Sequence, residues 1–312
     1  MSELKNELSY EEFQDVLKEK VQNKLDERIA VGITDVMKNN GVVLKGMTFS
    51  KEGEGISPTI YLEQYYVAYK KGADWAELVR KIVDIFHLGA KNEFFDLQAF
   101  LDFERAKEHI VYKLVNYEKN KELLEKIPHR QFLDMAVVYY YLVETEELSN
   151  ATILIYNNHL ENWNVTAEEL DAIAKENTPK LLKEDLRSMT EVIRELLRKK
   201  GIPEEEIFTE EPEEEVMYVL SNNTQVFGAA AILYSGVLKA FAKKVKKDLL
   251  ILPSSVHEVI ILPKSDDMNV ETLRQMVMEV NSTQVEEVEV LSDNVYCYER
   301  KTDALTFAKN IA

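Results

Sequence analysis

Apolar positions in the first third of the chain show both helical and strand spacing. A capping-box sequence begins at Ser9, and the apolar residues after it recur every three or four positions, which predicts an amphipathic helix. Two apolar stretches, 29–36 and 42–49, flank an Asn-Asn-Gly turn sequence and predict a β-hairpin. Helical spacing then returns, with one helix expected over 97–107. Residues 1–106 are therefore predicted to form a helical and hairpin N-terminal part.

The remainder of the chain contains two stretches with the same order of patterns. Residues 110–178 and 216–283 each indicate strand, helix, strand, strand, helix. Each stretch closes its first strand with an asparagine and precedes its second strand with an aspartate: Asn116 and Asp134 in the first, Asn222 and Asp248 in the second. Agreement in order and approximate spacing favours an internal duplication.

These patterns predict an α+β protein in which two related βαββα halves, residues 107–203 and 216–312, follow the N-terminal part. The first half is expected to end in a helix over 180–200. Between the halves lies the segment 204–215, in which eight of twelve residues are Glu. Such a run of like charge predicts a solvated acidic linker.

Polar residues gather where two strands of the second half are expected to end. The strands 216–221 and 249–253 are expected to run parallel, joined by a helix that begins near Thr224, so their carboxyl ends would meet at one edge of a sheet. The N-terminus of that helix would favour an anionic or polar small ligand. The candidate ligand-binding residues are Asn222, Asn223, Ser254, Ser255, His257 and Glu258. The alternative is that these side chains only cap the helix and form the turn between strands.

The same cluster permits a second interpretation, in which His257 activates Ser254 or Ser255 as the nucleophile of a hydrolase. Two observations weigh against it. The alternation of a strand would turn His257 and Glu258 to opposite faces, and the sequence has no Gly-x-Ser-x-Gly elbow. No residue is therefore predicted to be catalytic.

No pattern in the sequence indicates a metal or a cofactor. The remaining histidines lack His-x-x-x-His and His-Glu-x-x-His spacing, and the glycines form no dinucleotide-binding or Walker-type motif. These histidines are His87, His109, His129 and His159. We therefore predict no metal site and no cofactor.

Charge and cysteine content narrow the classes of partner. The formal net charge of −18 makes a nucleic acid an unexpected partner, because binding to phosphates relies on Lys and Arg; an acidic mimic of nucleic acid remains an alternative. A single cysteine, Cys297, forms no intrachain disulfide and suits a reducing compartment. The longest apolar stretch, 226–238, spans 13 residues, whereas a membrane helix needs about 20. With no signal-peptide pattern at the N-terminus, the sequence predicts a cytoplasmic protein with no membrane partner.

Three segments carry a resemblance to a known family: GITDVMKNNGVVLKGMTF, ISPTIYLEQYY and DLLILPSSVHEVIILP. They resemble a family of uncharacterised proteins, a domain of unknown function common in anaerobic gut Firmicutes, over nearly the whole chain. The resemblance implies no activity for any residue. A further segment, WNVTAEELDAIAKENT, is similar to a motif of a second uncharacterised family, of Bacillus-type bacteria.

Because caps, turns and solvated faces account for most polar residues, the sequence predicts a soluble, non-catalytic binding or regulatory module. Its expected partner is a small polar ligand or another protein. The alternatives are the hydrolase that uses Ser254 or Ser255 with His257, and the acidic mimic of nucleic acid.

Overall fold

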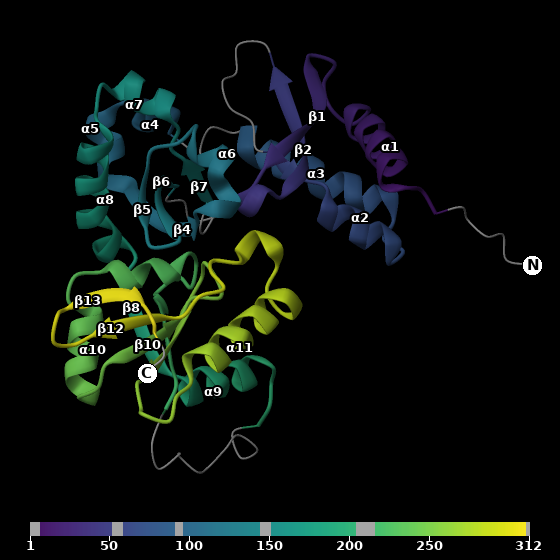
Figure 1. Cartoon of the computed structure of the whole chain (residues 1–312). Helices are drawn as coiled ribbons and strands as arrows, with labels where there is room; N and C mark the ends of the chain where they lie inside the picture. Colours follow the sequence, from purple (N-terminus) through teal and green to yellow (C-terminus); the bar gives the residue numbers. More distant parts are fainter. Residues whose placement is uncertain (1–6, 52–58, 91–95, 144–150, 204–215, 310–312) are drawn as a thin grey trace, which may run out of the picture. The chain divides into compact units, whose positions relative to one another are not determined.

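The computed structural model describes residues 7–51, 59–90, 96–143, 151–203 and 216–309 (Figure 1). The chain divides into two compact units. The first comprises Met1–Leu97 with Thr145–Leu148, and the second comprises Gln98–Glu144 with Ser149–Ala312. The predicted acidic linker, 204–215, lies outside the described residues.

The first unit combines three helices with a three-stranded antiparallel sheet. Its helices are α1 (Tyr10–Gln22), α2 (Glu63–Lys70) and α3 (Trp75–Ala90), and its strands are β1 (Ile29–Met37), β2 (Val43–Lys51) and β3 (Ile60–Tyr61). The capping box at Ser9 is confirmed, since the Glu12 backbone N–H donates to Ser9 Oγ and the Ser9 N–H donates to Glu12 Oε2. The hairpin is also confirmed, with Asn40 of its turn in the left-handed conformation at φ 60°.

Helices of this unit bury one face each against the sheet. Phe13 and Leu17 of α1, Met47 of β2 and Ile82 of α3 are fully buried in one core. Complete burial of such side chains contributes roughly 1.5 to 3 kcal/mol each. The apolar residues that recur at helical spacing in the sequence are therefore the ones that pack into this core.

The helix expected over 97–107 is wrong as a single element. The chain forms α4 (Leu97–Leu101) and α5 (Phe103–Ala106), and Asp102 separates them. The Asp102 side chain accepts a hydrogen bond from the Glu104 N–H and so caps a new helix.

The second unit begins with an antiparallel sheet built around β6 (Met135–Val143). Strand β4 (Ile110–Asn116) pairs with one edge of β6, and β5 (His129–Phe132) and β7 (Ala151–Leu154) both pair with β6 as well. Side chains from Met135 to Tyr141 are buried, which explains why this strand is apolar throughout. The helices of this part are α6 (Lys121–Leu124), α7 (Asn157–Trp163) and α8 (Ala167–Leu181).

A six-stranded antiparallel sheet forms the rest of the second unit, in the order β13-β12-β10-β11-β9-β8. The strands are β8 (Glu184–Ser188), β9 (Tyr218–Asn222), β10 (Leu249–Leu252), β11 (Val259–Pro263), β12 (Tyr296–Glu299) and β13 (Ala304–Phe307). The helices are α9 (Met189–Lys199), α10 (Val237–Val245) and α11 (Val270–Thr283). The class of fold, α+β, is thus confirmed.

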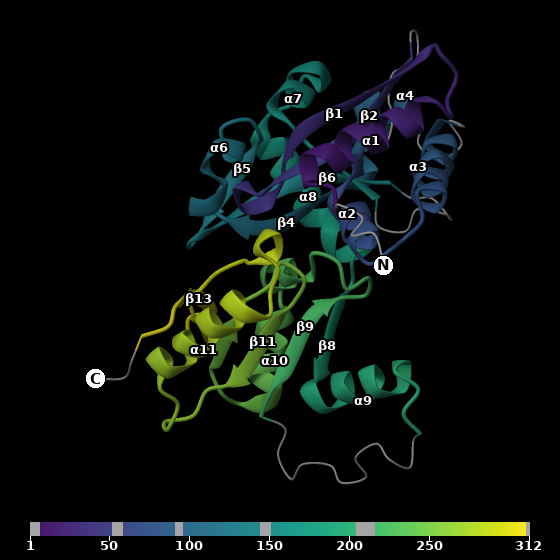
Figure 2. The same cartoon turned by 90° about the vertical axis from the view of Figure 1, so that its right-hand side faces the viewer.

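Different helices cover the two faces of this sheet (Figures 1 and 2). Leu250 and Leu262 form a cluster with Val277 of α11, whereas Tyr218, from the opposite face, contacts Phe241 of α10. Helix α9 lies on the α11 side, where its side chains approach Val219 and Ile260.

The helix expected over 180–200 is also wrong in its first part. Residues 180 and 181 are the end of α8, residues 184–188 form β8, which pairs with β9, and α9 covers only 189–199. Ser188 accepts from the Glu191 N–H, and the Ser188 N–H donates to Glu191 Oε2. This capping box starts α9 and thereby ends the strand.

The strand order does not support the duplication. The matched strands run β4-β6-β7 in the first sheet but β9-β11-β10 in the second. In the second sheet β11 therefore lies between the two strands that match β4 and β6, whereas β4 and β6 are neighbours in the first sheet. Since β9 and β10 are each antiparallel to β11, they run parallel to one another, and their carboxyl ends still lie at one edge.

Candidate functional site

The loop 223–227 follows β9 at this edge and is organised by Asn222. The Asn222 side chain is fully buried; its Nδ2 donates to the Val226 carbonyl (2.8 Å), and its Oδ1 accepts from the N–H and the hydroxyl of Thr224 (3.1 and 2.9 Å). Gln225 and Phe227 adopt left-handed φ values of 58° and 56°. Each such residue costs about 1 to 2 kcal/mol unless its surroundings hold it.

No α-helix begins near Thr224, contrary to the sequence prediction. The segment continues as a 3₁₀ helix, Gly228–Leu233, and α10 begins at Val237 after Gly236, which has φ 82°. Asn222 uses its amide to close a turn instead of capping a helix. The positive helix end that would have favoured an anion is therefore missing from this edge.

His257 is fixed at this edge by both of its ring nitrogens. Its Nδ1 accepts the Phe227 N–H (3.2 Å), and its Nε2 lies 3.2 Å from Glu289 Oε1. The imidazole also stacks on the Phe227 ring, with centroids 5.6 Å apart and planes 12° from parallel. These contacts fit the neutral tautomer that carries its proton on Nε2 and donates it to Glu289.

Hydrogen bonds between serine hydroxyls and the backbone, and close packing at Gly228, hold the same region together. The Ser221 hydroxyl donates to the His257 carbonyl (2.7 Å), and the His257 N–H donates to Ser255 Oγ (3.0 Å). A Cβ on Gly228 would lie 2.1 Å from Ser221 Oγ and 2.6 Å from the His257 carbonyl oxygen. Only glycine therefore fits between β9 and the turn that carries His257.

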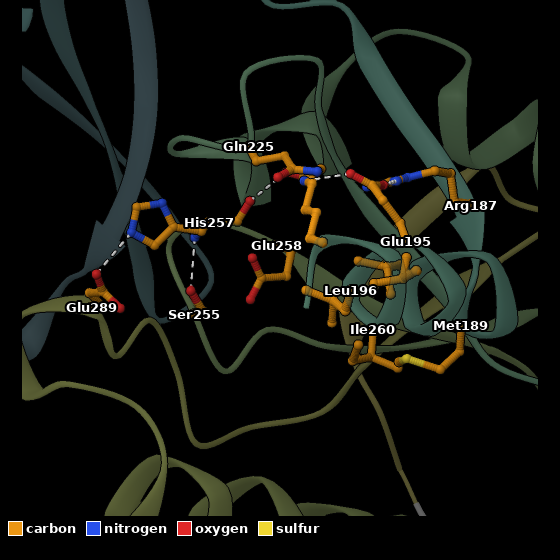
Figure 3. Close-up of a pocket in the computed structure, with 14 residues that line it drawn as sticks. Arg187, Met189, Glu195, Leu196, Gln225, Ser255, His257, Glu258, Ile260 and Glu289 are labelled. Atoms are coloured by element: carbon orange, nitrogen blue, oxygen red, sulfur yellow. Dashed lines mark hydrogen bonds and ion pairs between the residues drawn. The ribbon is translucent and has the colours of Figure 1, made fainter. Parts of the chain in front are cut away.

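A cavity of about 570 Å³ lies beside this turn, between α9 and the sheet (Figure 3). We call it the sheet-face cavity. Its volume is in the range of small-molecule sites, roughly 300 to 1,000 Å³. Apolar side chains of α9 and of the sheet form one part of its lining: Met189, Val192, Leu196, Val219 and Ile260. Polar side chains form the rest: Arg187, Glu195, Lys199, Ser221, Gln225, Ser255, His257, Glu258 and Glu289.

Glu258 differs from the other carboxylates of this lining. Figure 3 shows it between the His257–Glu289 pair and the apolar side chains of α9 and β11. Among the described residues, it has neither a hydrogen-bond donor nor an ion-pair partner. Burial is the main cause that raises the pKa of the Glu258 carboxyl; nearby His257 opposes this and Glu289 adds to it.

At the rim of the cavity, unlike at Glu258, the charged side chains form ion pairs with one another. Glu195 forms ion pairs with Arg187 and with Lys199, the latter at 2.5 Å, and hydrogen bonds from both cations lower the pKa of its carboxyl. Arg187 is paired with Asp185 as well, at 2.9 Å. The rim charges are therefore mutually neutralised, and the carboxylate left without a partner is Glu258.

Three of the six candidate residues line the cavity together, namely Ser255, His257 and Glu258. The other three do not. Asn222 is buried in its own loop, Asn223 is exposed, and Ser254 contributes its backbone carbonyl, which accepts from the Leu291 N–H. The expectation that His257 and Glu258 face opposite ways is wrong, because both precede β11 and lie in the turn before it.

Sequence reasoning missed two contributions to this site. The α9 wall was missed because residues 180–200 were interpreted as one helix, which leaves no strand to place α9 on the sheet. Its signal was available in the Ser188–Glu191 capping box. Glu289 was missed because it reaches His257 from 32 residues away, through a backbone bond between its carbonyl and the Val256 N–H. No local pattern marks such a contact.

Among the described residues, no group of three or more His, Cys, Asp or Glu side chains is placed to hold a metal ion. No helix in the described part of the chain has the length and apolar character needed to cross a membrane.

Fold and site together define an α+β protein with a ligand-sized cavity on one face of an antiparallel sheet. Residues 10–300 match a family model described as a family of unknown function (DUF5688), and the chain belongs to that family. Searches of the curated proteins and of the solved structures found no match. The expected taxonomic range and the second, local resemblance stay predictions.

Proposed function

We propose that the protein is a non-catalytic binding module and that its sheet-face cavity takes a small organic cation with an apolar body. One observation carries this proposal: Glu258 lines the cavity as a half-buried carboxylate without a partner among the described residues. Charged groups in such surroundings are normally paired. A ligand ammonium group would complete the pair.

The remainder of the lining supports the same class of ligand. The ammonium group would sit near Glu258 and the His257–Glu289 pair, where carboxylate oxygens accept its protons. The alkyl body would pack against Leu196 of α9 and Ile260 of β11. An anion, which the sequence had suggested, would instead meet two carboxylates without a helix N-terminus to offset them.

The geometry favours binding over hydrolysis. A serine nucleophile needs an imidazole nitrogen as the acceptor of its proton. Here Nδ1 of His257 accepts from Phe227 and Nε2 contacts Glu289, while Ser255 Oγ accepts a backbone N–H. Neither Ser254 nor Ser255 has a base on its hydroxyl in this arrangement.

Calorimetric titration with three ligands of equal length tests the proposal. We expect n-hexylamine to bind, hexanol to bind at least tenfold more weakly, and hexanoate not to bind, since only the amine supplies a cation to Glu258. In parallel, a fluorophosphonate probe should leave Ser254 and Ser255 unlabelled. Labelling that disappears in Ser255→Ala or Ser254→Ala would support the hydrolase instead, and equal binding of all three ligands would contradict the cation.

A further inference from the structure

The first unit contains a separate cavity of about 730 Å³, between the C-terminal end of α1 and the first turns of α3. Its lining includes Lys20 from α1, Lys24 from the turn that follows α1, and Trp75, Val79 and Arg80 from α3. We call these five residues the basic pocket. We propose that the basic pocket binds a small aromatic carboxylate. This site is independent of the sheet-face cavity and would take a ligand of opposite charge.

The basic pocket is rich in positive charge, whereas the chain as a whole is acidic. The whole chain carries a formal charge of −18, yet three cations, Lys20, Lys24 and Arg80, line this cavity. None of the three forms an ion pair with another described residue. The lining has one carboxylate, Asp74, and its Oδ2 already accepts the Ala76 N–H at 2.9 Å. Positive charge at this place is therefore available to a ligand.

Trp75 gives the pocket an aromatic surface in a fixed orientation. Its ring packs on Phe13 and Tyr69, with centroids 5.4 and 5.2 Å apart, and Lys20 Nζ lies 5.5 Å from its centroid. The indole N–H has no acceptor among the described residues. An indole fixed in this way can stack on a ligand ring and donate one hydrogen bond.

The apolar side chains of the lining favour an aromatic carboxylate over an inorganic anion such as phosphate. Val79 is buried, and Ala76 and Val83 extend the same surface beside Trp75. Inorganic phosphate would use only the cations and would leave this surface in contact with water. An aromatic carboxylate uses both, because its ring covers the apolar surface while its carboxylate meets Lys20 and Lys24, which line the same cavity.

Nuclear magnetic resonance of the two indole N–H groups can test this proposal with 2-naphthoate as the probe. The chain has two tryptophans, and the N–H of Trp163 already donates to the Phe100 carbonyl at 3.0 Å. We expect 2-naphthoate to shift the Trp75 signal, identified with Trp75→Phe, and to leave the Trp163 signal in place. The neutral analogue 2-naphthamide should bind at least tenfold more weakly.

Charge variants complete the test. Lys20→Gln with Lys24→Gln should weaken 2-naphthoate at least tenfold, whereas Lys18→Gln with Lys71→Gln, which removes the same charge from exposed positions outside the pocket, should change affinity less than twofold. All four lysines are exposed, so both double variants should keep the melting temperature. The proposal is overturned by the absence of a Trp75 shift at millimolar 2-naphthoate, by equal binding of 2-naphthamide, or by equal effects of the two double variants.

Discussion

The two sheets of the second unit begin from similar sequence patterns but connect their strands differently. In the first sheet β6 lies between β4 on one edge and β5 with β7 on the other. In the second sheet β11 lies between β9 and β10. Because β11 is antiparallel to both, the turn that leads into it falls at the edge where β9 and β10 end.

That difference in strand order explains why the candidate residues line a cavity at the second sheet. The turn into β11 carries Ser255, His257 and Glu258 to the end of β9, next to the loop that Asn222 organises. In the first sheet the corresponding edge brings Asn116 opposite Met135, and β6 is buried along most of its length. Similar local patterns therefore lead to an edge that lines a cavity in one case and to a closed core in the other.

The largest expected difference in stability is between variants of Asp134 and Asp248, the aspartates that precede the matched strands β6 and β10. Asp134 accepts from Ser292 Oγ, Asn294 Nδ2 and Tyr296 Oη at 2.6, 2.9 and 2.5 Å, and so joins the first sheet to β12 of the second. Among the described residues, the Asp248 carboxylate accepts one hydrogen bond, from the Arg300 N–H at 2.9 Å.

We expect Asp134→Ala to lower the free energy of unfolding by about 3 kcal/mol, since it leaves two hydroxyls and an amide without their acceptor. Asp248→Ala should cost about 1 kcal/mol, the value of a single exposed hydrogen bond. Urea denaturation of both variants measures the contrast. Equal costs would show that the bonds of Asp134 do not stabilise the contact between the sheets.

A smaller difference in stability is expected between variants of Asn116 and Asn222, the asparagines that end β4 and β9. Asn222 is fully buried with three side-chain hydrogen bonds, while Asn116 is half-buried and bonds to the Leu291 carbonyl and the Lys119 N–H. Asn222→Ala should therefore destabilise the fold by about 2 kcal/mol, and Asn116→Ala by about 1 kcal/mol. Thermal unfolding of the matched pair checks this order, which would be contradicted by a larger loss in Asn116→Ala.

Local sequence patterns predicted many of the strands and helices of the second half, but they could not predict the order of its strands in the sheet. The end of β9 at Asn222 and the nearness of Asn222 to His257 follow from neighbouring residues and from parallel strand direction. The insertion of β11 depends on pairing between residues some forty positions apart, such as Leu220 with Val259. Strand β8 was hidden in a charged segment, where Leu186 is the one apolar residue between Glu184 and Ser188. Long-range pairing decides such cases, and local propensity does not.

The smallest expected effect concerns the protonation of Glu258. Burial raises the pKa of this carboxyl above its ordinary value of 4.5, so the folded protein keeps the proton to higher pH than the unfolded chain does. Its contribution to stability is full below the unfolded pKa and is lost as the pH rises through the folded pKa. Glu258→Gln stays neutral and should therefore gain stability relative to the wild type from pH 4.5 to neutrality.

A matched variant isolates this effect. Glu286→Gln removes a charge from an exposed position outside the cavity. Melting temperatures of the two variants and the wild type, measured across the same pH range, should diverge only for Glu258→Gln. A difference between wild type and Glu258→Gln that stays constant with pH would contradict the raised pKa.

The affinity of n-hexylamine for the wild type, Glu258→Gln and Glu286→Gln tests the central claim most directly. If the Glu258 carboxylate binds the ammonium group, Glu258→Gln should weaken binding at least tenfold, which corresponds to about 1.4 kcal/mol, and Glu286→Gln should leave it unchanged. Isothermal titration calorimetry at neutral pH gives all three constants. Equal affinities in the wild type and Glu258→Gln, or no binding of n-hexylamine to the wild type at millimolar concentrations, would contradict the account.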